Sequence, residues 1–446
     1  MNAPHPNSTF LKIPALKQIQ GILRLPGSKS ITNRALILAA LSRGKTRLHH
    51  LLWSDDTIYM VRALREHLGV NVLGDIGDNT VTVSGQSGTF PSTGANIFVG
   101  NSGTSIRFLT AAISLGSGDF SLTGVERMKE RPIRDLVNAL QQIGAKIDYA
   151  EKEGFPPINV HASGLSGGPL RIKGNVSSQY LTAILLAAPC MQKPLSIEVD
   201  GELISKPYVT MTIRMMEQFG VRVENDHFQR FFVPNTGYHS PEDYDIEGDA
   251  SSASYALAAA AIAKGPVRVE GIDKNSLQGD IHFAEVLQEM GADVAYGKGF
   301  VECREKTFPL RAIDKDLSAI PDAAMTVAAL CLFANGKSRI RGIHSWKVKE
   351  TDRIAAMATE LRKTGAQVFT TDDSITIVPP ETLSPAEFDT YDDHRMAMCM
   401  SLVAFGIQNE NSIVIREPLC VKKTYPEYWS DLSALTGNSF NSPAEE

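Results

Sequence analysis

The feature that most constrains the fold of this chain is an internal repeat. A turn followed by a run of small and apolar residues recurs six times, starting at residues 26, 100, 174, 248, 321 and 392, so that successive copies begin 71 to 74 residues apart. Five of the six openings carry Ser, Asp or Asn beside the first turn, where such residues cap helices. The Ala- and Leu-rich runs contain few polar residues, which predicts buried helices. We therefore expect six copies of one structural unit.

A second element of the repeat is a helix that ends in glycine and is followed by a strand. It is found five times, with the glycines 71 to 76 residues apart at Gly69, Gly144, Gly220, Gly291 and Gly365. Glycine ends a helix because it adopts the left-handed conformation without steric cost. The alternating apolar residues that come next are typical of a strand. Together the two elements predict an α/β fold.

The number of units suggests how they are grouped. Six such units do not easily share one core, so two domains of three units each is the economical arrangement, and a length of 446 residues agrees with it. We place the hinge near the turn-rich segment 234–245. Because helix N-termini bind anions, a cleft between the domains that is ringed by these termini is the expected ligand site. In the alternative interpretation the repeat is inert and its caps are only structural.

Composition excludes several classes of partner. A net charge of −6 and a pI near 6.0 argue against nucleic acid or an anionic membrane as the main partner. The five cysteines form no CxxC pair, as expected of reduced thiols in the cytoplasm. We expect no signal peptide, because residues 1–10 lack Lys, Arg and an apolar run, and no membrane span. The tail 437–446 is expected to be disordered.

The familiar cofactor motifs are missing from the sequence. The segment 26–30, PGSKS, lacks the spacing of a phosphate-binding P-loop. There is no GxGxxG after a strand, no HExxH and no GxSxG. We therefore expect an enzyme that needs no metal, nucleotide or flavin.

The openings of the repeats carry an unusual number of polar and cationic residues. Taken singly, each of these motifs could be a surface turn or a solvated helix face. Cations in the same position of successive repeats would instead converge on one cleft and bind a substrate with several negative charges. A structural role for the histidine among them is at least as well supported as a role in the site. These residues are Lys29, Ser30, Arg34, Asn101, Gly103, Thr104, Arg107, Arg131, Ser177, Ser178, Gln179, Lys349, Glu350, Arg353, His394, Arg395 and Lys423.

Seven short sequence motifs carry a family resemblance. LPGSKSITNR, RMKERPI, VSSQ, GDASSASY, IPDAAM, VKETDR and YDDHRMAM occur here in the order in which they occur in 3-phosphoshikimate 1-carboxyvinyltransferases. The chain resembles that family from about residue 12 to about residue 430. The resemblance implies a two-domain inside-out α/β barrel of six βαβαββ-like repeats, three per domain, with the active site in the interdomain cleft. It implies a first domain at 22–245 and a second at 1–21 plus 246–446, completed by the N-terminal strand.

The resemblance further implies an activity and a set of roles. The family transfers the carboxyvinyl group of phosphoenolpyruvate to the 5-hydroxyl of shikimate 3-phosphate, without a cofactor, and glyphosate inhibits much of it. We expect a cytoplasmic monomer that acts on these two small molecules. By resemblance, Asp322 takes the hydroxyl proton, while Glu350 and Lys29 assist proton transfer at the methylene carbon. The residues matched to shikimate 3-phosphate are Lys29, Ser30, Arg34, Ser177, Ser178, Gln179, Ser205, Tyr208, Asp322 and Lys349. Those matched to phosphoenolpyruvate are Lys29, Asn101, Gly103, Arg131, Gln179, Arg353, Arg395 and Lys423.

Two positions depart from the family pattern. Close relatives often have Asn where this chain has Ser345, so no substrate contact is assigned to it. Many have Pro where this chain has Phe108, and the larger residue beside Arg107 is expected to shift the helix that carries Gly103 and Thr104.

Two rival functions share the same scaffold. One is the sister enzyme that acts on a UDP-amino sugar, whose loop often uses a cysteine, but none lies at 115–131 here. The other is a noncatalytic protein that binds phosphorylated metabolites. Such a protein would have no reason to keep Asp322 together with Glu350.

Overall fold

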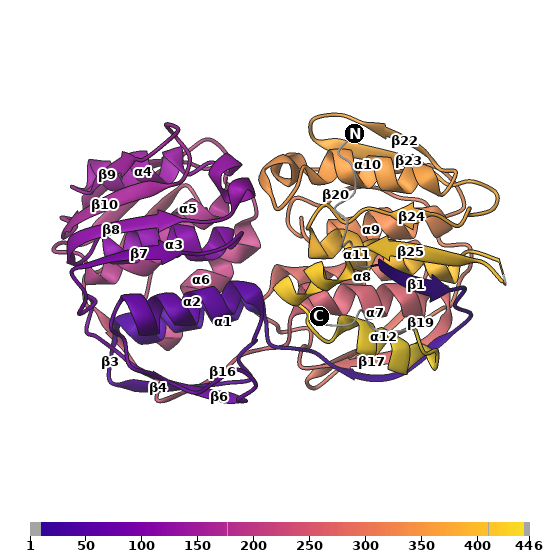
Figure 1. Ribbon diagram of the computed structural model, residues 1–446, viewed down its shortest axis with the longest axis horizontal. Coiled ribbons are helices and arrows are strands. Elements are labelled where there is room, and N and C mark those ends of the chain that lie inside the picture. Colours follow the sequence, from indigo (N-terminus) through magenta and orange to yellow (C-terminus); the bar gives the residue numbers. More distant parts are fainter. Residues whose placement is uncertain (1–9, 176, 409, 441–446) are drawn as a thin grey trace. The chain divides into compact units, whose positions relative to one another are not determined.

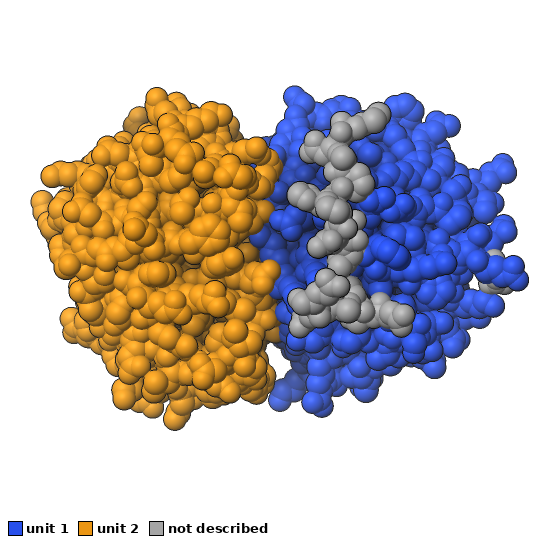
Figure 2. Space-filling model, viewed as in Figure 1, with its two compact units in different colours: residues 1–26, 248–446 blue, residues 27–247 orange. Residues whose placement is uncertain are grey.

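The computed structural model describes residues 10–175, 177–408 and 410–440. They form two compact units, which Figures 1 and 2 show: unit 1 consists of Met1–Pro26 with Gly248–Glu446, and unit 2 of Gly27–Glu247. Residues 1–9, where we expect no signal peptide, lie outside the described residues, and so do residues 441–446 of the tail that we expect to be disordered. Within that tail, Phe440 is buried against the core of unit 1, so disorder was the wrong prediction for this aromatic residue.

One repeat of unit 2 shows the path of the chain. Its four strands form a sheet in the order β7-β8-β10-β9, in which β7 runs parallel to β8 and the other neighbours are antiparallel. A helix joins the two parallel strands, as parallel pairing requires. The elements are β7 (Gly94–Phe98), α3 (Gly103–Ile113), β8 (Ser117–Thr123), α4 (Arg134–Gln142), β9 (Lys146–Tyr149) and β10 (Ile158–Ser163).

The same path recurs in both units, which confirms the predicted βαβαββ repeat for these segments. In unit 2 the sheet β11-β12-β14-β13 has this pattern, and in unit 1 so does β20-β21-β23-β22. The first consists of β11 (Gly168–Lys173), α5 (Ser178–Ala187), β12 (Leu195–Asp200), α6 (Lys206–Gln218), β13 (Glu224–Asp226) and β14 (Arg230–Val233). The second consists of β20 (Asp314–Asp316), α9 (Ala324–Leu330), β21 (Ser338–Arg341), α10 (Arg353–Lys363), β22 (Gln367–Thr370) and β23 (Ser374–Val378).

Two repeats exchange their first strands. β2 (Ile19–Arg24) precedes α1 (Lys29–Leu41) but pairs with β17 (Lys264–Glu270) in unit 1. Conversely, β16 (Asp243–Asp245) precedes α7 (Ala250–Ile262) but pairs with β4 (Lys45–His49) in unit 2. The sheets are β16-β4-β6-β5 and β18-β19-β17-β2. Their other elements are α2 (Asp55–Arg62), β5 (Val72–Leu73), β6 (Thr80–Ser84), α8 (Phe283–Met290), β18 (Asp293–Gly297) and β19 (Phe300–Arg304).

The exchange changes the interpretation of segment 234–245, where we placed the hinge. That segment carries two short strands, β15 (Tyr238–His239) and β16, and both pair inside unit 2, with β3 (Ser42–Arg43) and β4. The chain leaves unit 2 only after Glu247. Turn-forming residues flank these strands, and their pairing partners lie too far away in sequence to be recognised locally.

The N-terminus completes the sixth repeat. β24 (Glu387–Phe388) runs parallel to β25 (Ser412–Arg416), with α11 (His394–Ser401) between them in sequence. The third strand of this sheet is β1 (Phe10–Pro14), antiparallel to β25. α12 (Tyr428–Thr436) ends at Gly437 without a following strand in the described chain. A strand from the other end of the chain takes that place, which explains why the glycine-ended element is found only five times.

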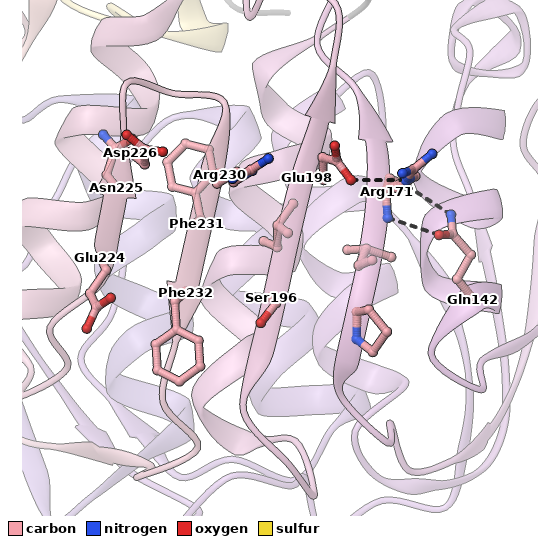
Figure 3. A pocket seen from close by; sticks show the side chains of 13 residues that line it. Gln142, Arg171, Ser196, Glu198, Glu224, Asn225, Asp226, Arg230, Phe231 and Phe232 are labelled. Carbon is pink, nitrogen blue, oxygen red and sulfur yellow. Dashed lines mark hydrogen bonds and ion pairs between the residues drawn. The ribbon is translucent and has the colours of Figure 1, made fainter.

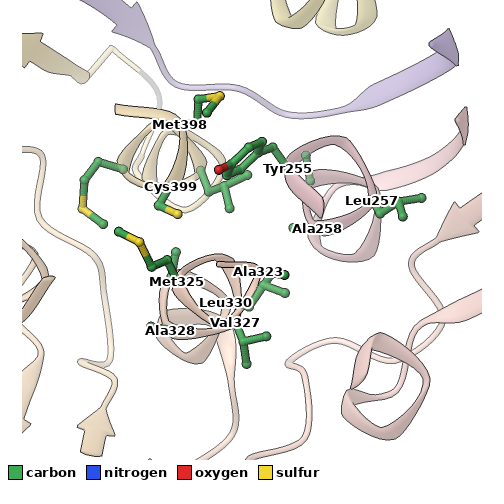
Figure 4. Packing of buried hydrophobic residues seen from close by; sticks show 14 of the residues in the cluster. Tyr255, Leu257, Ala258, Ala323, Met325, Val327, Ala328, Leu330, Met398 and Cys399 are labelled. Carbon is green, nitrogen blue, oxygen red and sulfur yellow. The ribbon is translucent and has the colours of Figure 1, made fainter. Parts of the chain in front are cut away.

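The repeat helices form the interior, as their composition predicts. In unit 2, α1 and α5 both contact α3, and in unit 1 α9 contacts both α7 and α11. Figure 4 shows Tyr255, Met325 and Cys399 of these three helices packed together. Five of the six helices have a side-chain cap, from Ser28, Ser102, Ser177, Asp249 and Asp393.

The five predicted helix-ending glycines all have positive φ, between 74° and 106°. None of the helices in the described ranges has the length and apolar character that crossing a bilayer requires.

Candidate active site

Asp322 lies in the turn before α9, and its carboxylate contacts three cations of unit 1. Its Oδ1 atom is 3.0 Å from Nη1 of Arg353 and 3.2 Å from Nζ of Lys349. Its Oδ2 atom accepts a hydrogen bond of 3.1 Å from Nη2 of Arg395. α9 is also the repeat helix that has no side-chain cap. The acidic side chain in this opening therefore binds cations instead of helix amides.

Arg353 connects this carboxylate to two others. Its side chain is 1% exposed. Its Nη2 atom donates to Oε2 of Glu350 at 2.9 Å, and its Nε atom donates to Oδ2 of Asp393 at 2.7 Å. Asp393 also caps α11 by accepting from the backbone N–H of Arg395. The capping role agrees with the Asp expected at the opening of this repeat, but the pairing with Arg353 was missed, although Asp393 stands in the YDDHRMAM motif.

The buried charges shift one another's pKa values. Burial alone would raise the pKa of Asp322, but the positive charges of Arg395, Lys349 and Arg353 outweigh it and hold this pKa well below its usual value. Burial lowers the pKa of Lys349, and the carboxylate of Asp322 only partly offsets that effect. Burial also disfavours the Arg353 cation, yet the neighbouring carboxylates raise its pKa. The cluster thus holds an ionised carboxylate among cations.

The remaining predicted residues of unit 1 surround this cluster. Arg395 also donates from Nη1 to the hydroxyl of Tyr255 at 3.2 Å. Lys423 ends a 3₁₀ helix (Pro418–Lys423) that contacts α11, and it is 7% exposed. His394 is fully buried, with its Nδ1 atom 3.7 Å from Oδ1 of Asp393. Ser345 is buried in the 3₁₀ helix His344–Val348.

In unit 2, a network joins the N-terminus of α3 to the turn at 131–132. Nη1 of Arg131 donates to the backbone and side-chain oxygens of Asn101, at 2.8 and 3.0 Å. Nη1 of Arg107 donates to the carbonyl of Gly103 at 2.9 Å. A Cβ atom at Gly103 would overlap the guanidinium groups of both arginines. Glycine allows this close approach, because a side chain here would displace the ends of two cationic side chains.

Gln179 extends the same network to the N-terminus of α5. Its Oε1 atom accepts from Nη1 of Arg107 at 2.9 Å, and its Nε2 atom lies 3.5 Å from the hydroxyl of Thr104. Arg107 donates from Nη2 to the carbonyl of Pro132 at 3.2 Å. The structure thus brings together Asn101, Gly103, Arg131 and Gln179, four of the residues matched to phosphoenolpyruvate. Arg107 is the residue that links them, although it was given no specific role.

The two cations of α1 differ in their partners. Lys29 forms a 3.2 Å ion pair with Asp56, a residue that sequence reasoning missed. Arg34 donates from Nε to the hydroxyl of Thr212 at 2.9 Å and from Nη1 to the carbonyl of Ser30 at 2.9 Å. Burial lowers the pKa of Arg34 to about 10. Its hydrogen-bond partners are neutral.

The predicted hydroxyl residues lie at helix starts. Ser177 caps α5 by accepting from the backbone N–H of Gln179, and Ser178 begins that helix. Ser205 precedes α6 in the left-handed conformation, with φ of 52° and no side-chain cap bond. The carbonyl of Tyr208 accepts from Thr212, which itself binds Arg34, so α6 is tied to the opening of α1.

A hollow elsewhere on unit 2 does not fit an anionic substrate. It lies over the sheet β11-β12-β14-β13, where Figure 3 shows Arg171 directed toward Glu198 and Gln142. The Arg171–Glu198 pair is 3.1 Å apart and its side chains are 78% and 51% exposed. The further carboxylates of Glu224 and Asp226 make the lining more acidic than basic. No predicted site residue lines it. In the described parts of the chain, no group of three or more His, Cys, Asp or Glu side chains could hold a metal ion.

Comparison with known proteins gives this geometry a family. The family model of EPSP synthase (3-phosphoshikimate 1-carboxyvinyltransferase) matches residues 13–432. The chain belongs to the EPSP synthase family. Curated EPSP synthase relatives named 3-phosphoshikimate 1-carboxyvinyltransferase include one from Thiobacillus denitrificans, 53% identical over 96% of this chain and 99% of that protein. Another, from Tolumonas auensis, is 51% identical with the same coverage.

Solved structures support the α/β fold of this EPSP synthase family member. The EPSP synthase of Acinetobacter baumannii has a TM-score of 0.80 at 24% identity, covering 98% of this chain and 100% of that one. The enolpyruvyl transferase NikO from Streptomyces tendae has a TM-score of 0.78 at 18% identity, covering 99% of this chain and 100% of that one. At these identities the likeness concerns the fold alone.

Proposed function

We propose that this chain transfers the carboxyvinyl group of phosphoenolpyruvate to the 5-hydroxyl of shikimate 3-phosphate and releases phosphate. The reaction belongs to the shikimate pathway, which leads to chorismate and the aromatic amino acids. Membership of the EPSP synthase family supports this activity. The structural observation that carries it is the carboxylate of Asp322 held among Lys349, Arg353 and Arg395. An acid–base group among anion-binding side chains suits a reaction between two anions.

Charge accounts for the binding of both substrates. Each carries a phosphate and a carboxylate, roughly three negative charges near neutral pH. Arginine grips such groups with two N–H donors, whereas lysine acts as a point charge. For shikimate 3-phosphate we assign Lys29, Ser30, Arg34, Ser177, Ser178, Gln179, Ser205, Tyr208, Asp322 and Lys349. For phosphoenolpyruvate we assign Lys29, Asn101, Gly103, Arg131, Gln179, Arg353, Arg395 and Lys423.

The chemistry divides between two carboxylates. A proton delivered to C3 of phosphoenolpyruvate, with Glu350 and Lys29 assisting, leaves positive charge at C2. The 5-hydroxyl oxygen attacks C2 and its proton passes to Asp322. The C2–O bond to phosphate then breaks, phosphate leaves, and C3 loses a proton to restore the double bond. An ionised Asp322 is ready to accept a proton, and Glu350 is held 2.9 Å from Arg353 next to it.

We propose that the two units close over the substrates, as two domains of an inside-out α/β barrel with the active site between them. The support is the distribution of the assigned residues: Lys29, Arg34 and Arg131 belong to unit 2, and Asp322 and Arg353 to unit 1. One molecule each of phosphoenolpyruvate and shikimate 3-phosphate can contact both sets of residues only if the two units meet around the substrates. Closure would also exclude water from the reactive intermediate. We propose a cytoplasmic monomer that needs no cofactor.

The test is phosphate release from phosphoenolpyruvate with and without shikimate 3-phosphate. We expect release that depends on the second substrate and forms 5-enolpyruvylshikimate 3-phosphate. Release that depends on a UDP-amino sugar would favour the sister enzyme. Binding of both substrates without release would favour a noncatalytic protein.

A further inference from the structure

Three buried arginines of the repeat helices each lie against an aromatic side chain from another repeat helix of the same unit. In unit 2, the Cζ atom of Arg34 on α1 lies 5.2 Å from the ring centre of Phe108 on α3. The Cζ atom of Arg107 on α3 lies 5.4 Å from the ring centre of Tyr180 on α5. In unit 1, Arg395 on α11 meets the hydroxyl of Tyr255 on α7. The repeat thus places an aromatic residue beside each of these cations.

Of these three arginines, Arg34 is the one whose positive charge is least balanced by its hydrogen-bond partners. Arg107 uses both terminal nitrogens on Gly103, Gln179 and Pro132. Arg34 binds one hydroxyl and one backbone carbonyl, and in the described residues its Nη2 atom has no hydrogen-bond partner and its guanidinium no ion pair. The residue is only 2% exposed. Burying a cation without a carboxylate is costly unless other groups attract it.

The ring of Phe108 supplies such an attraction. The face of an aromatic ring carries partial negative charge and attracts a guanidinium within about 6 Å of its centre. The ring has no net charge. It also accepts no hydrogen bond from the N–H groups, which lie in the plane of the guanidinium. A carboxylate in the same place would neutralise Arg34 and compete with an anionic ligand. The ring therefore positions the cation and leaves its charge for a substrate.

We propose that Phe108 is a positioning residue whose ring holds Arg34 for the phosphorylated substrate and thereby sets the affinity for shikimate 3-phosphate. This inference rests on the proposed function, which assigns Arg34 to that substrate. It gives Phe108 a role besides the expected shift of α3. The ring is 1% exposed, and α3 begins at Gly103 with a regular cap from Ser102.

The test changes the charge on the face of the Phe108 ring in steps, while the volume of the side chain stays nearly constant. Phe108 is replaced by 4-fluoro-, 3,5-difluoro- and 3,4,5-trifluorophenylalanine, which progressively remove negative charge from the ring face. We expect KM for shikimate 3-phosphate to rise stepwise, by about three- to tenfold at the last step. kcat and KM for phosphoenolpyruvate should change by less than about twofold, because the ring acts on the other substrate. Phe219, fully buried in unit 2 beside Tyr244, is the matched control and should show no such series.

A double-mutant cycle checks that the ring acts through the cation. Phe108→Leu should raise KM for shikimate 3-phosphate in the parent but not in an Arg34→Gln background. A rise with Phe108→Leu that is equal in both backgrounds, or fluorinated variants that all match the parent, would show that Phe108 acts by packing and would overturn the proposal.

Binding measurements separate this proposal from the proposed function. Calorimetric titration with shikimate 3-phosphate, and with inorganic phosphate as a smaller probe, needs no turnover. If the parent binds these ligands but releases no phosphate from phosphoenolpyruvate, the proposed function fails while the series still decides the role of Phe108. If the parent binds neither ligand, both fail.

Discussion

Arg353 donates from Nη1 to Oδ1 of Asp322 at 3.0 Å, and the arginine side chain is almost completely buried. The carboxylate that we propose as the base is thus held by a buried cation. The same guanidinium binds Glu350, so its position fixes both acid–base groups at once. The pKa values of such neighbours depend on each other and on any anion that the cations bind.

Replacing Asp322 with Asn should reduce turnover far more than binding. The amide keeps the shape of the side chain but cannot take the hydroxyl proton, and loss of a general base typically costs about 10²–10⁴ in kcat. KM for shikimate 3-phosphate should change much less, because the cations remain and the amide oxygen can still accept a hydrogen bond from the substrate hydroxyl. Steady-state kinetics test this, with Asp314→Asn as the control, since Asp314 pairs with Arg341 at a more exposed position of the same unit. A kcat within about threefold of the parent would refute the role of Asp322.

Substrate binding should raise the pKa of Asp322. In the free protein three cations hold that pKa well below its usual value. An anionic substrate that binds Lys349, Arg353 or Arg395 draws positive charge away from the carboxylate. Activity requires the ionised form and is lost as pH falls through the pKa. The acid limb of kcat, which reports the complex, should therefore lie at higher pH than the limb of kcat/KM that reports the free enzyme.

A variant separates this effect from titration of the substrate itself. Lys349→Met removes one cation beside Asp322 and should move the acid limb of kcat/KM to higher pH, whereas the ionisation of the substrate is the same for both proteins. An acid limb of kcat/KM that stays at the same pH, or moves to lower pH, would contradict the assignment of Asp322 as the base.

The repeat was predictable because its signals are local. Caps, glycines at helix ends and Ala-rich runs act within a few residues, and they correctly located the six buried helices. The exchanged strands β2 and β16 were not predictable in this way. β2 has six residues and β16 has three. Asp243 of β16 pairs with Arg47, which lies 196 positions away. Pairing over such a distance is decided by tertiary packing.

The site was predicted in part, for the same reason. The resemblance named the cations and Asp322, but it did not name Asp393, whose partner Arg353 is 40 positions away. Its place immediately before His394, the first residue of α11, was the one local signal for it. Phe108 was judged only by its sequence neighbour Arg107, whereas its ring lies against Arg34 of another helix.

Binding of shikimate 3-phosphate should make the protein more compact. Without ligand, no shared anion draws Lys29 and Arg34 of unit 2 toward Lys349 and Arg353 of unit 1, so we expect the open state to be favoured. An anion that binds both sets reverses that balance. Small-angle scattering should show a smaller radius of gyration at saturating shikimate 3-phosphate than with shikimate, which lacks the phosphate. An unchanged radius would count against closure.

His161 should make stability depend on pH. Its Nδ1 atom is 2.5 Å from Asp119 and its Nε2 atom 3.2 Å from Asp148. The hydrogen bond to Asp119, and a smaller one to Asp148, raise the pKa of His161. The stabilisation is complete below the unfolded pKa, near 6.5, and is lost as pH rises through the folded value. His161→Gln should lower the urea midpoint at pH 5.5 more than at pH 9. His227→Gln, at a 96% exposed side chain, is the control and should show no such difference.

Gly103→Ala should weaken phosphoenolpyruvate binding and weaken glyphosate binding more. The added methyl group would overlap the guanidinium groups of Arg107 and Arg131, which are held by Gln179 and Asn101. Crowding of this kind costs about 1–3 kcal/mol, so we expect KM for phosphoenolpyruvate to rise about tenfold. Glyphosate is the longer ligand and needs the space beside Gly103, so its inhibition constant should rise by a larger factor. Gly116→Ala is the matched control, because a Cβ there makes only an ordinary 3.6 Å contact with the carbonyl of Ile113. Competition kinetics against phosphoenolpyruvate measure both constants. Equal changes for inhibitor and substrate, or no change in either, would show that Gly103 does not line the pocket.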